Sequence, residues 1–343
     1  MMRAMVLPGF GGPEVLRCEQ VARPQPAPDE MLVRVACCGV CGHDLLNRAG
    51  AFPHTRLPCV MGHEIAGTVA AVGPLVTTLR VGDRVALCQR ISCGICAVCR
   101  HGRDDLCRAG AGFYGEELSG GYGDYVIASP RNAVRLPDDM AFDVSAVLSC
   151  AVGTGYHALG RARLAPGDSV VITAASGGVG IHTVKLGRAM GLRVIAVSSS
   201  PSKTGRLREA GADHVVVAPD FAFHAEVKEL TEGAGADAVI EIAGARTFPS
   251  ATRCLKAGGR LVLVGNLEPG TVALNPALAI LKELEIIGSA HATVADLQQV
   301  VELVRRGRIA PEIGARLPLT EAAAAHRMMT DKATLGRVVL MHA

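Results

Sequence analysis

The pattern of apolar and polar positions changes partway along the chain. Through residue 150, short runs of Val, Ala and Leu are punctuated by glycine and proline, a pattern typical of antiparallel strands joined by turns. The sequence therefore predicts a mainly β region first. The strands that we expect there are residues 32–36, 65–72, 84–88 and 125–128.

From about Ser169 onward, apolar runs alternate with segments of helical periodicity. This alternation is typical of a doubly wound parallel sheet with helices on both faces. A helix at residues 295–306 and a strand at residues 336–341 are expected after the sheet. The six predicted strands of this Rossmann sheet are residues 169–173, 193–198, 214–218, 237–242, 260–265 and 284–289.

The length of 343 residues favours two domains, each large enough for its own core. We place a mainly β domain at residues 1–152 and 289–343, and an α/β domain at residues 153–288. The chain is therefore expected to leave a discontinuous first domain, build the second, and return.

Composition narrows the class of protein. Hydrophobic residues make up 49% and charged residues 20%, which suits a folded chain. The net charge of +3, the aromatic share of 3% and the absence of Trp argue against a nucleic-acid partner. No apolar run reaches the roughly 18 residues of a membrane helix, and residues 1–7 lack a signal pattern. We expect a cytoplasmic protein that does not act at a membrane.

Four of the twelve cysteines form a compact cluster with the spacing C-x2-C-x2-C-x7-C. Clustered cysteines in a reducing cytosol more often bind metal than form disulfides. Four thiolates complete a tetrahedral shell around zinc, so the cluster predicts a structural zinc that stiffens a loop. Four free thiols or an iron–sulfur cluster are the alternatives. The cluster consists of Cys93, Cys96, Cys99 and Cys107.

A second candidate metal set is spread along the chain. Cys41 lies in Gly-Val-Cys-Gly-His-Asp, His63 and Glu64 follow about twenty residues later, and Cys150 lies at the domain junction. Two thiolates and one imidazole would leave zinc an open position for a substrate oxygen. Sequence separation leaves open the alternative that Cys150 is an ordinary buried cysteine.

The first strand of the α/β region runs into Ala-Ser-Gly-Gly-Val-Gly and then a helical segment at residues 181–190. Glycines let the backbone approach a pyrophosphate, and a helix N-terminus presents free amides to it. This strand, turn and helix predict a dinucleotide site. Its expected residues are Ser176, Gly177, Gly178, Val179, Gly180 and, at the end of a later strand, Gly265.

The following strand ends at Ser198, Ser199 and Ser200, without the acidic residue that binds the ribose 2′-hydroxyl of NAD. Lys203 and Arg206 add positive charge suited to a 2′-phosphate. The pattern therefore favours NADP(H) over NAD(H). The alternative is that the two cations only begin a solvated helix.

Over nearly the whole chain, these motifs resemble the zinc-dependent alcohol dehydrogenase branch of the medium-chain dehydrogenase/reductase superfamily. The resemblance implies a GroES-like catalytic domain beside the Rossmann domain, and one catalytic and one structural zinc per subunit. It also implies a homodimer or homotetramer that acts on a small molecule.

The resemblance assigns roles to individual positions. The positions matching Cys41, His63 and Cys150 hold the catalytic zinc in that family. Glu64 matches a residue that can enter the coordination sphere transiently, and Asp44 matches one that orients the ligand histidine.

Two further positions match cofactor contacts of the family. Thr154 matches a residue that touches the nicotinamide ring, and Arg337 matches an arginine that reaches the pyrophosphate. At His43 the chain departs from its alcohol-oxidising relatives, which have a Ser or Thr that starts a proton relay. An imidazole can itself take a proton near neutral pH, so His43 is either a replacement relay base or a hydrogen-bonded loop histidine.

The expected function is hydride transfer between NADP(H) and a small alcohol, aldehyde or ketone with the help of zinc. Residues 44–53, 115–117 and 120–122 also resemble a subgroup that includes acryloyl-CoA reductases. The alternative function is therefore NADPH-dependent reduction of an activated double bond. A third hypothesis is a non-catalytic protein with the dehydrogenase fold. The presence of both metal sets and of the glycine-rich phosphate turn argues against it.

Overall fold

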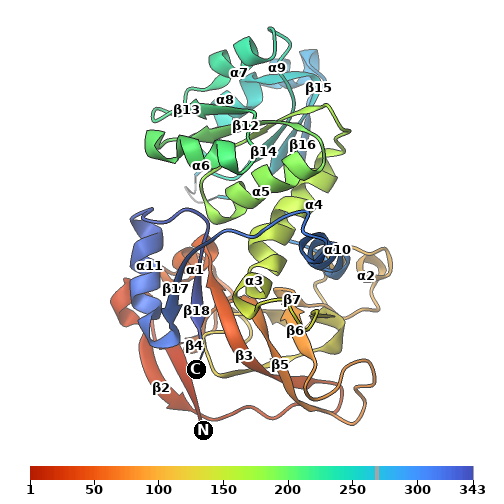
Figure 1. Cartoon of the computed structure of the whole chain (residues 1–343), viewed down its shortest axis with the longest axis vertical. Helices are drawn as coiled ribbons and strands as arrows, with labels where there is room; N and C mark the ends of the chain where they lie inside the picture. Colours follow the sequence, from red (N-terminus) through yellow and green to blue (C-terminus); the bar gives the residue numbers. More distant parts are fainter. Residues whose placement is uncertain (267–269, 343) are drawn as a thin grey trace. The chain divides into compact units, whose positions relative to one another are not determined.

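The computed structural model describes residues 1–266 and 270–342, and these residues form two compact units (Figure 1). The first unit comprises residues 1–153, 292–307 and 313–343, and the second comprises residues 154–291 and 308–312. Residues 308–312, which the sequence placed in the first domain, therefore pack with the second unit.

The first unit is built on a seven-stranded sheet, ordered β10-β6-β5-β3-β18-β17, with β9 also paired to β3. All four strands that the sequence predicted before residue 150 belong to it, and the long β3 pairs with β5, β9 and β18. The strands are β3 (Met31–Val40), β5 (Glu64–Val72), β6 (Arg84–Leu87), β9 (Tyr125–Ala128), β10 (Ala133–Arg135), β17 (Ile313–Pro318) and β18 (Arg337–Met341).

Two smaller sheets of this unit lack a clear signal in the sequence. β1 (Met2–Leu7), β2 (Arg17–Val21) and β4 (Cys59–Val60) form one, and β7 (Arg90–Ile91) and β8 (Gly112–Phe113) form the other. The side chains of β2 are almost all exposed, so apolar and polar residues do not alternate along it. β4, β7 and β8 have two residues each, which is too short for any periodicity.

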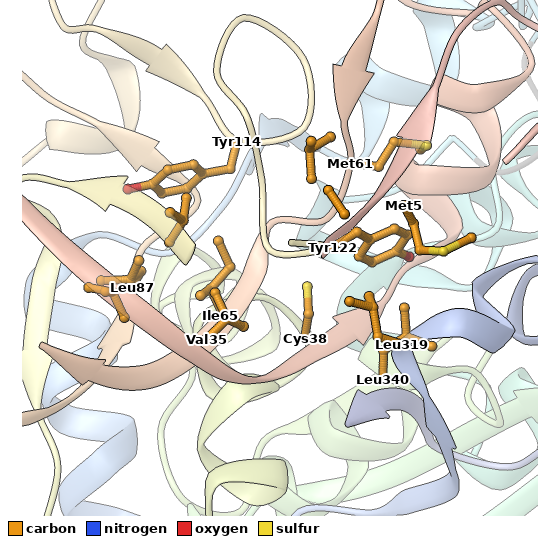
Figure 2. Close-up of a cluster of buried hydrophobic side chains, with 14 of the residues drawn as sticks. Met5, Val35, Cys38, Met61, Ile65, Leu87, Tyr114, Tyr122, Leu319 and Leu340 are labelled. Carbon is orange, nitrogen blue, oxygen red and sulfur yellow. The ribbon is translucent and has the colours of Figure 1, made fainter. Parts of the chain in front are cut away.

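The core of the first unit is a cluster of buried side chains from β3, β5, β6 and β18, joined by two tyrosines (Figure 2). Tyr114 donates a hydrogen bond from its hydroxyl to the carbonyl of Ile127 (2.9 Å), and the Tyr122 hydroxyl lies 3.1 Å from Nε2 of His326. Each ring is therefore buried with its polar end satisfied. This core fixes β3 and β5, whose ends carry the residues of the metal site.

Short helices close the first unit. The predicted helix at residues 295–306 is α10 (Val294–Arg305), and it begins at a capping box between Thr293 and Asp296. The helical elements are η1 (Pro13–Val15), α1 (Gly42–Arg48), α2 (Ala97–Arg100), η2 (Asp104–Leu106), η3 (Pro130–Asn132), α3 (Phe142–Ala146), the π-helical η4 (Leu148–Val152), α10, η6 (Leu319–Glu321) and α11 (Ala322–Thr330).

The second unit contains the predicted six-stranded parallel sheet, ordered β13-β12-β11-β14-β15-β16. The strand order reverses between β11 and β14, and ligands of such sheets bind at the carboxyl ends of the strands at this switch point. The elements are α4 (Gly153–Ala162), β11 (Ser169–Ile172), α5 (Gly178–Ala189), β12 (Arg193–Ser198), η5 (Pro201–Lys203), α6 (Thr204–Glu209), β13 (His214–Val217), α7 (His224–Leu230), β14 (Ala236–Glu241), α8 (Phe248–Arg253), β15 (Leu255–Leu263), α9 (Pro276–Leu281) and β16 (Glu285–Gly288).

Membrane-spanning helices were searched for across residues 1–266 and 270–342. None of the helices there has both the length and the apolar character that crossing a bilayer requires.

The turn after β11 contains one residue in a conformation that favours glycine. Ala174 has a φ of 46°, whereas its neighbour Ala175 is buried with an ordinary φ. A Cβ at Gly180 would overlap the carbonyl oxygen of Ala174, so the turn and the first turn of α5 are in close contact. Local strain is thus stored at the glycine-rich turn.

We predict that Ala174→Gly raises the free energy of unfolding by about 0.5–1 kcal/mol, because glycine adopts a positive φ without the steric cost that alanine bears. Ala175→Gly is the matched control and should lower stability, since it removes a buried methyl group at an ordinary φ. Thermal or denaturant unfolding of the two variants measures both effects. Equal destabilisation by the two substitutions would contradict the assignment of strain to Ala174.

Candidate metal and dinucleotide sites

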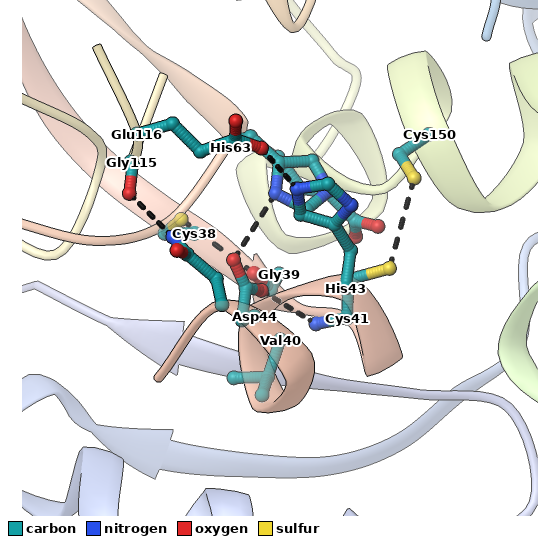
Figure 3. A network of polar contacts seen from close by, with 12 residues as sticks. Cys38, Gly39, Val40, Cys41, His43, Asp44, His63, Gly115, Glu116 and Cys150 are labelled. Atoms are coloured by element: carbon teal, nitrogen blue, oxygen red, sulfur yellow. Dashed lines mark hydrogen bonds and ion pairs between the residues drawn. The ribbon is translucent and has the colours of Figure 1, made fainter. Parts of the chain in front are cut away.

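The structure brings Cys41, His63, Glu64 and Cys150 together, with one ligand atom from each within 4.8 Å of the others. All four residues are buried and belong to the first unit, and Figure 3 shows the sulfurs of Cys41 and Cys150 facing each other. The pairing of β3 with β5 places Gly39 opposite Glu64, so Cys41, just after β3, lies beside His63, just before β5. Cys150 comes from η4.

The donor atoms fit a single tetrahedral zinc ion. The sulfurs of Cys41 and Cys150 lie 3.9 Å apart. Two thiolates on one tetrahedral zinc, each at about 2.3 Å, are about 3.8 Å apart. A hydrogen bond from the Cys150 thiol holds the pKa of Cys41 well below its ordinary value and that of Cys150 well above it. A divalent cation between the sulfurs would replace that shared proton.

Asp44 contacts the ring of His63, the histidine that the resemblance assigns to the zinc. Its Oδ1 lies 3.1 Å from Nδ1 of His63, and its Oδ2 accepts a hydrogen bond from the backbone amide of Cys41 (2.8 Å). With Nδ1 donating to the carboxylate, Nε2 is the nitrogen that would bind a metal, with the loss of its proton. Burial lowers the pKa of His63, but the charges and hydrogen bonds of Asp44 and Cys41 outweigh burial and raise it well above its ordinary value.

Glu64 is paired with a buried arginine from β18. Arg337 Nη2 lies 2.8 Å from Glu64 Oε1, and both side chains are almost fully buried. Burial raises the pKa of Glu64 to about 7 even though Arg337 favours its carboxylate form. A Cβ at Gly39 would overlap Oε2 of Glu64, so the glycine in β3 makes room for the carboxylate. The predicted contact of Arg337 with the coenzyme pyrophosphate stays a prediction.

His43 forms a close pair with Glu116, which the sequence did not identify as a site residue. Nε2 of His43 lies 2.5 Å from Oε1 of Glu116, and the His43 ring stacks on Phe52 at 4.4 Å between centroids. The ring centroid also lies 5.2 Å from that of His63. The only sequence signal for Glu116 was its place in the motif at residues 115–117, which carries no spacing rule.

The loop that carries Glu116 is tied to α1. The side-chain amide of Asn47 donates to the carbonyl of Gly115 (2.6 Å). Within the loop, the backbone amide of Phe113 donates to the carboxylate of Glu117 (2.7 Å). Asn47 and His43 lie on the same short helix. The position of Glu116 is therefore set by the element that presents His43.

In the four-cysteine cluster, too, the distances between the sulfur atoms fit a single ion. The sulfur of Cys93 lies 3.9 Å from that of Cys99, and Cys96 lies 3.4 Å from Cys99 and 4.0 Å from Cys107. In an iron–sulfur cluster the thiolates bind different irons and lie farther apart, so one ion is favoured. Hydrogen bonds from the backbone amides of Ile95 and Cys96 lower the pKa of Cys93 to about 6, which favours the thiolate that a metal needs.

The glycine-rich turn occupies the switch point of the second unit. Gly177 is the N-cap of α5, and Gly178 to Gly180 form its first turn, directly after β11. Gly265 lies at the same edge, because a Cβ there would overlap the carbonyl oxygen of Ile242 just past β14. The structure thus brings Ser176, Gly177, Gly178, Val179, Gly180 and Gly265 to one end of the sheet.

The residues expected at a 2′-phosphate follow β12. The hydroxyl of Ser198 accepts from the amide of Ser200 (3.2 Å), and Lys203 is the N-cap of α6. Arg206 is engaged by two carboxylates, Glu312 at 2.5 Å and Glu209 at 3.3 Å. The sequence did not indicate Glu312, because it lies more than a hundred residues downstream. The phosphate contacts of Ser198, Ser199, Ser200, Lys203 and Arg206 stay predictions, as does the nicotinamide contact of Thr154.

Metal analysis tests the two sites. We predict two zinc ions per chain, one lost in Cys150→Ser with the fold retained and the other lost in Cys96→Ser. The second loss should also lower the melting temperature, because a closed zinc site contributes to folding. Cys18→Ser is the control, since Cys18 is exposed and outside both clusters. A chain that retains two ions in either ligand variant would contradict this assignment.

Comparison with known proteins gives the family. The model of the alcohol dehydrogenase GroES-like domain matches residues 27–138, and that of zinc-binding dehydrogenases matches residues 178–306. An acryloyl-coenzyme A reductase of Metallosphaera sedula is 34% identical over 341 residues, 99% of each chain. An alcohol dehydrogenase of Geobacillus stearothermophilus is 36% identical over 313 residues, 90% of each chain.

Solved structures agree with these matches. The crystal structure of AibC superimposes with a TM-score of 0.94 at 43% identity, covering 100% of this chain and 96% of that one. A crystal structure of an NAD-dependent alcohol dehydrogenase superimposes with a TM-score of 0.93 at 33% identity, covering 99% of each chain. Together with the GroES-like and Rossmann folds and the two metal-ligand clusters, these matches show that the chain belongs to the zinc-dependent alcohol dehydrogenase family of medium-chain oxidoreductases, with similarity to acryloyl-CoA reductases.

Proposed function

We propose that the protein is a zinc-dependent oxidoreductase that transfers a hydride between NADP(H) and a small alcohol, aldehyde or ketone. The observation that carries the proposal is the buried set of Cys41, His63 and Cys150, whose sulfur spacing fits one zinc ion. Zinc held there would supply a Lewis acid for the substrate oxygen, and the nicotinamide would supply or accept the hydride.

Asp44 and Arg337 position and neutralise side chains of the metal set. Asp44 fixes the ring of His63, and Arg337 neutralises the carboxylate of Glu64 beside the thiols. Glu64 therefore lies within reach of the same ion without adding an unpaired charge to the buried site.

The coenzyme preference rests on the end of β12. Three consecutive serines stand there in place of an acidic residue, and Lys203 and Arg206 follow at the start of α6. Hydroxyl donors and nearby cations suit a dianionic 2′-phosphate, whereas the absence of an acceptor carboxylate in this segment disfavours the free 2′-hydroxyl of NAD.

The pair of His43 and Glu116 supports a second candidate function, the reduction of an activated double bond. In that reaction the coenzyme hydride adds to the β-carbon, and a proton adds to the α-carbon. His43 is half-exposed, bears a ring nitrogen that can carry a proton, and is held by Glu116. A relative that is 34% identical over 99% of its length is an acryloyl-coenzyme A reductase.

A kinetic screen separates these functions. We expect kcat/KM for NADPH to exceed that for NADH with any accepted substrate, and we expect turnover of alcohols, aldehydes or ketones. Acryloyl-CoA and simple enones form the second substrate panel. Turnover of that panel alone would replace the alcohol function by the enoyl function, and a preference for NADH would refute the coenzyme assignment.

The role of His43 has its own test. His43→Phe keeps an aromatic ring to stack on Phe52 but removes both nitrogens, so kcat should fall by about 10²–10⁴-fold while KM changes little. Glu116→Gln retains a hydrogen-bonding side chain and should reduce kcat by less. His54→Phe, at an exposed histidine nearby, is the control. Unchanged kcat in His43→Phe would make His43 a structural loop residue.

We also propose that the protein forms a homodimer or homotetramer. β16 is an edge of the parallel sheet, and Ile286 in that strand is 41% exposed. Ile280 and Leu281 in α9 are 72% and 84% exposed. Among the described residues no further strand pairs with β16, and such an edge together with exposed apolar side chains favours association with another copy. Light scattering on the purified chain gives its mass in solution, and a monomer at micromolar concentration would refute the proposal.

A further inference from the structure

The segment at residues 308–312 is firmly attached to the helices that flank the predicted coenzyme site. Lys185 of α5 donates to the carbonyl of Ala310 (2.8 Å) and forms an ion pair with Glu312 (2.7 Å). The backbone amide of Glu312 donates to Nε2 of His182 (2.7 Å), and Nδ1 of His182 lies 2.5 Å from the carbonyl of Gly178. The position of Glu312 is therefore fixed by α5 and by the glycine-rich turn.

His182 is held as a neutral imidazole by these two backbone contacts. Its Nε2 accepts from an amide, so the proton lies on Nδ1 and is donated to the Gly178 carbonyl. A single side chain thus connects the start of α5 with the backbone of Glu312. Because this connection uses the backbone of Glu312, its carboxylate can pair with a side chain of the neighbouring helix α6.

The Glu312 carboxylate bridges two helices. One oxygen pairs with Lys185, and the other accepts from Nη2 of Arg206 in the first turn of α6 (2.5 Å). Burial raises the pKa of Glu312, but the hydrogen bond from Lys185 and the charges of Lys185 and Arg206 bring it below its ordinary value. Glu312 is therefore a carboxylate at neutral pH.

Arg206 is the less buried partner of this pair. Its side chain is 57% exposed, compared with 22% for Glu312. Lys203 and Arg206 are three residues apart at the start of α6, so they share a helix face directly after the three serines. Nη2 of Arg206 can therefore donate to a phosphate at the end of β12 only in competition with Glu312.

We propose that Glu312 is a specificity-determining residue that limits the preference for the 2′-phosphate by competing for Arg206. This inference rests on the proposed NADP(H) preference. A carboxylate paired with the guanidinium offsets its charge and occupies one of its nitrogens, so Glu312 reduces the contribution of Arg206 to phosphate binding. The ribose of NADH lacks the phosphate and gains nothing from the release of Arg206.

The test uses two fragments of the coenzyme and requires no substrate. Adenosine 2′,5′-bisphosphate carries the 2′-phosphate and 5′-AMP lacks it, and calorimetry gives the Kd of each for the full chain. Glu312→Gln should tighten binding of the bisphosphate about fivefold, the scale of a partly exposed ion pair, and leave 5′-AMP unchanged.

A double-mutant cycle assigns the effect to Arg206. In an Arg206→Gln background, Glu312→Gln should no longer change the Kd of the bisphosphate, because the shared cation is gone. Glu209→Gln is the matched control: it removes a carboxylate that contacts Arg206 at 3.3 Å from a more exposed position, and should have a smaller effect. Melting temperatures confirm that each variant is folded.

The outcomes distinguish the two proposals. Equal tightening of both nucleotides, a gain that persists without Arg206, or no gain at all would overturn the role of Glu312. A wild-type chain that binds the two nucleotides equally, but gains affinity for the bisphosphate in Glu312→Gln, would refute the NADP(H) preference and leave the role of Glu312 intact.

Discussion

The candidate metal site depends on the pairing of β3 with β5. This ladder sets Gly39 opposite Glu64, which places Cys41 and His63 at the same end of the sheet although twenty-odd residues separate them in the chain. Because a shift of one residue turns every side chain of a strand to the other face, the register of this ladder decides whether the ligands converge. The buried core around Tyr122 and Ile65 holds that register.

Burial of charge is the cost of this arrangement. Glu64 and Arg337 are both removed from water, and a buried ion pair rarely stabilises a fold more than a well-packed apolar pair would. Its retention is better explained by what the neighbouring thiols require. An arginine beside Cys41 favours the thiolate form, and a paired Glu64 leaves the site without a second uncompensated negative charge.

The sequence predicted the parts of the structure that short-range patterns specify. The cysteine spacing at residues 93–107 identified its cluster, and alternation of apolar runs with helices identified the six-stranded sheet. Residue spacing alone left Cys150 open, because it lies 109 residues from Cys41 in a π-helical turn; the family resemblance supplied its role. Glu116 and Glu312 were missed because their partners, His43 and Arg206, are far away in the sequence and are brought to them only by tertiary packing.

The placement of residues 308–312 has a consequence for dissecting this molecule. The continuous stretch at residues 154–291 contains every strand of the parallel sheet, yet it lacks the five residues that pack with it from farther along the chain. A fragment cut at those limits would lose the Glu312 amide that donates to Nε2 of His182, and Lys185 would lose its contacts with Glu312 and the Ala310 carbonyl. A fragment designed to reproduce the second unit therefore has to include residues 308–312 as a second segment, joined to residues 154–291.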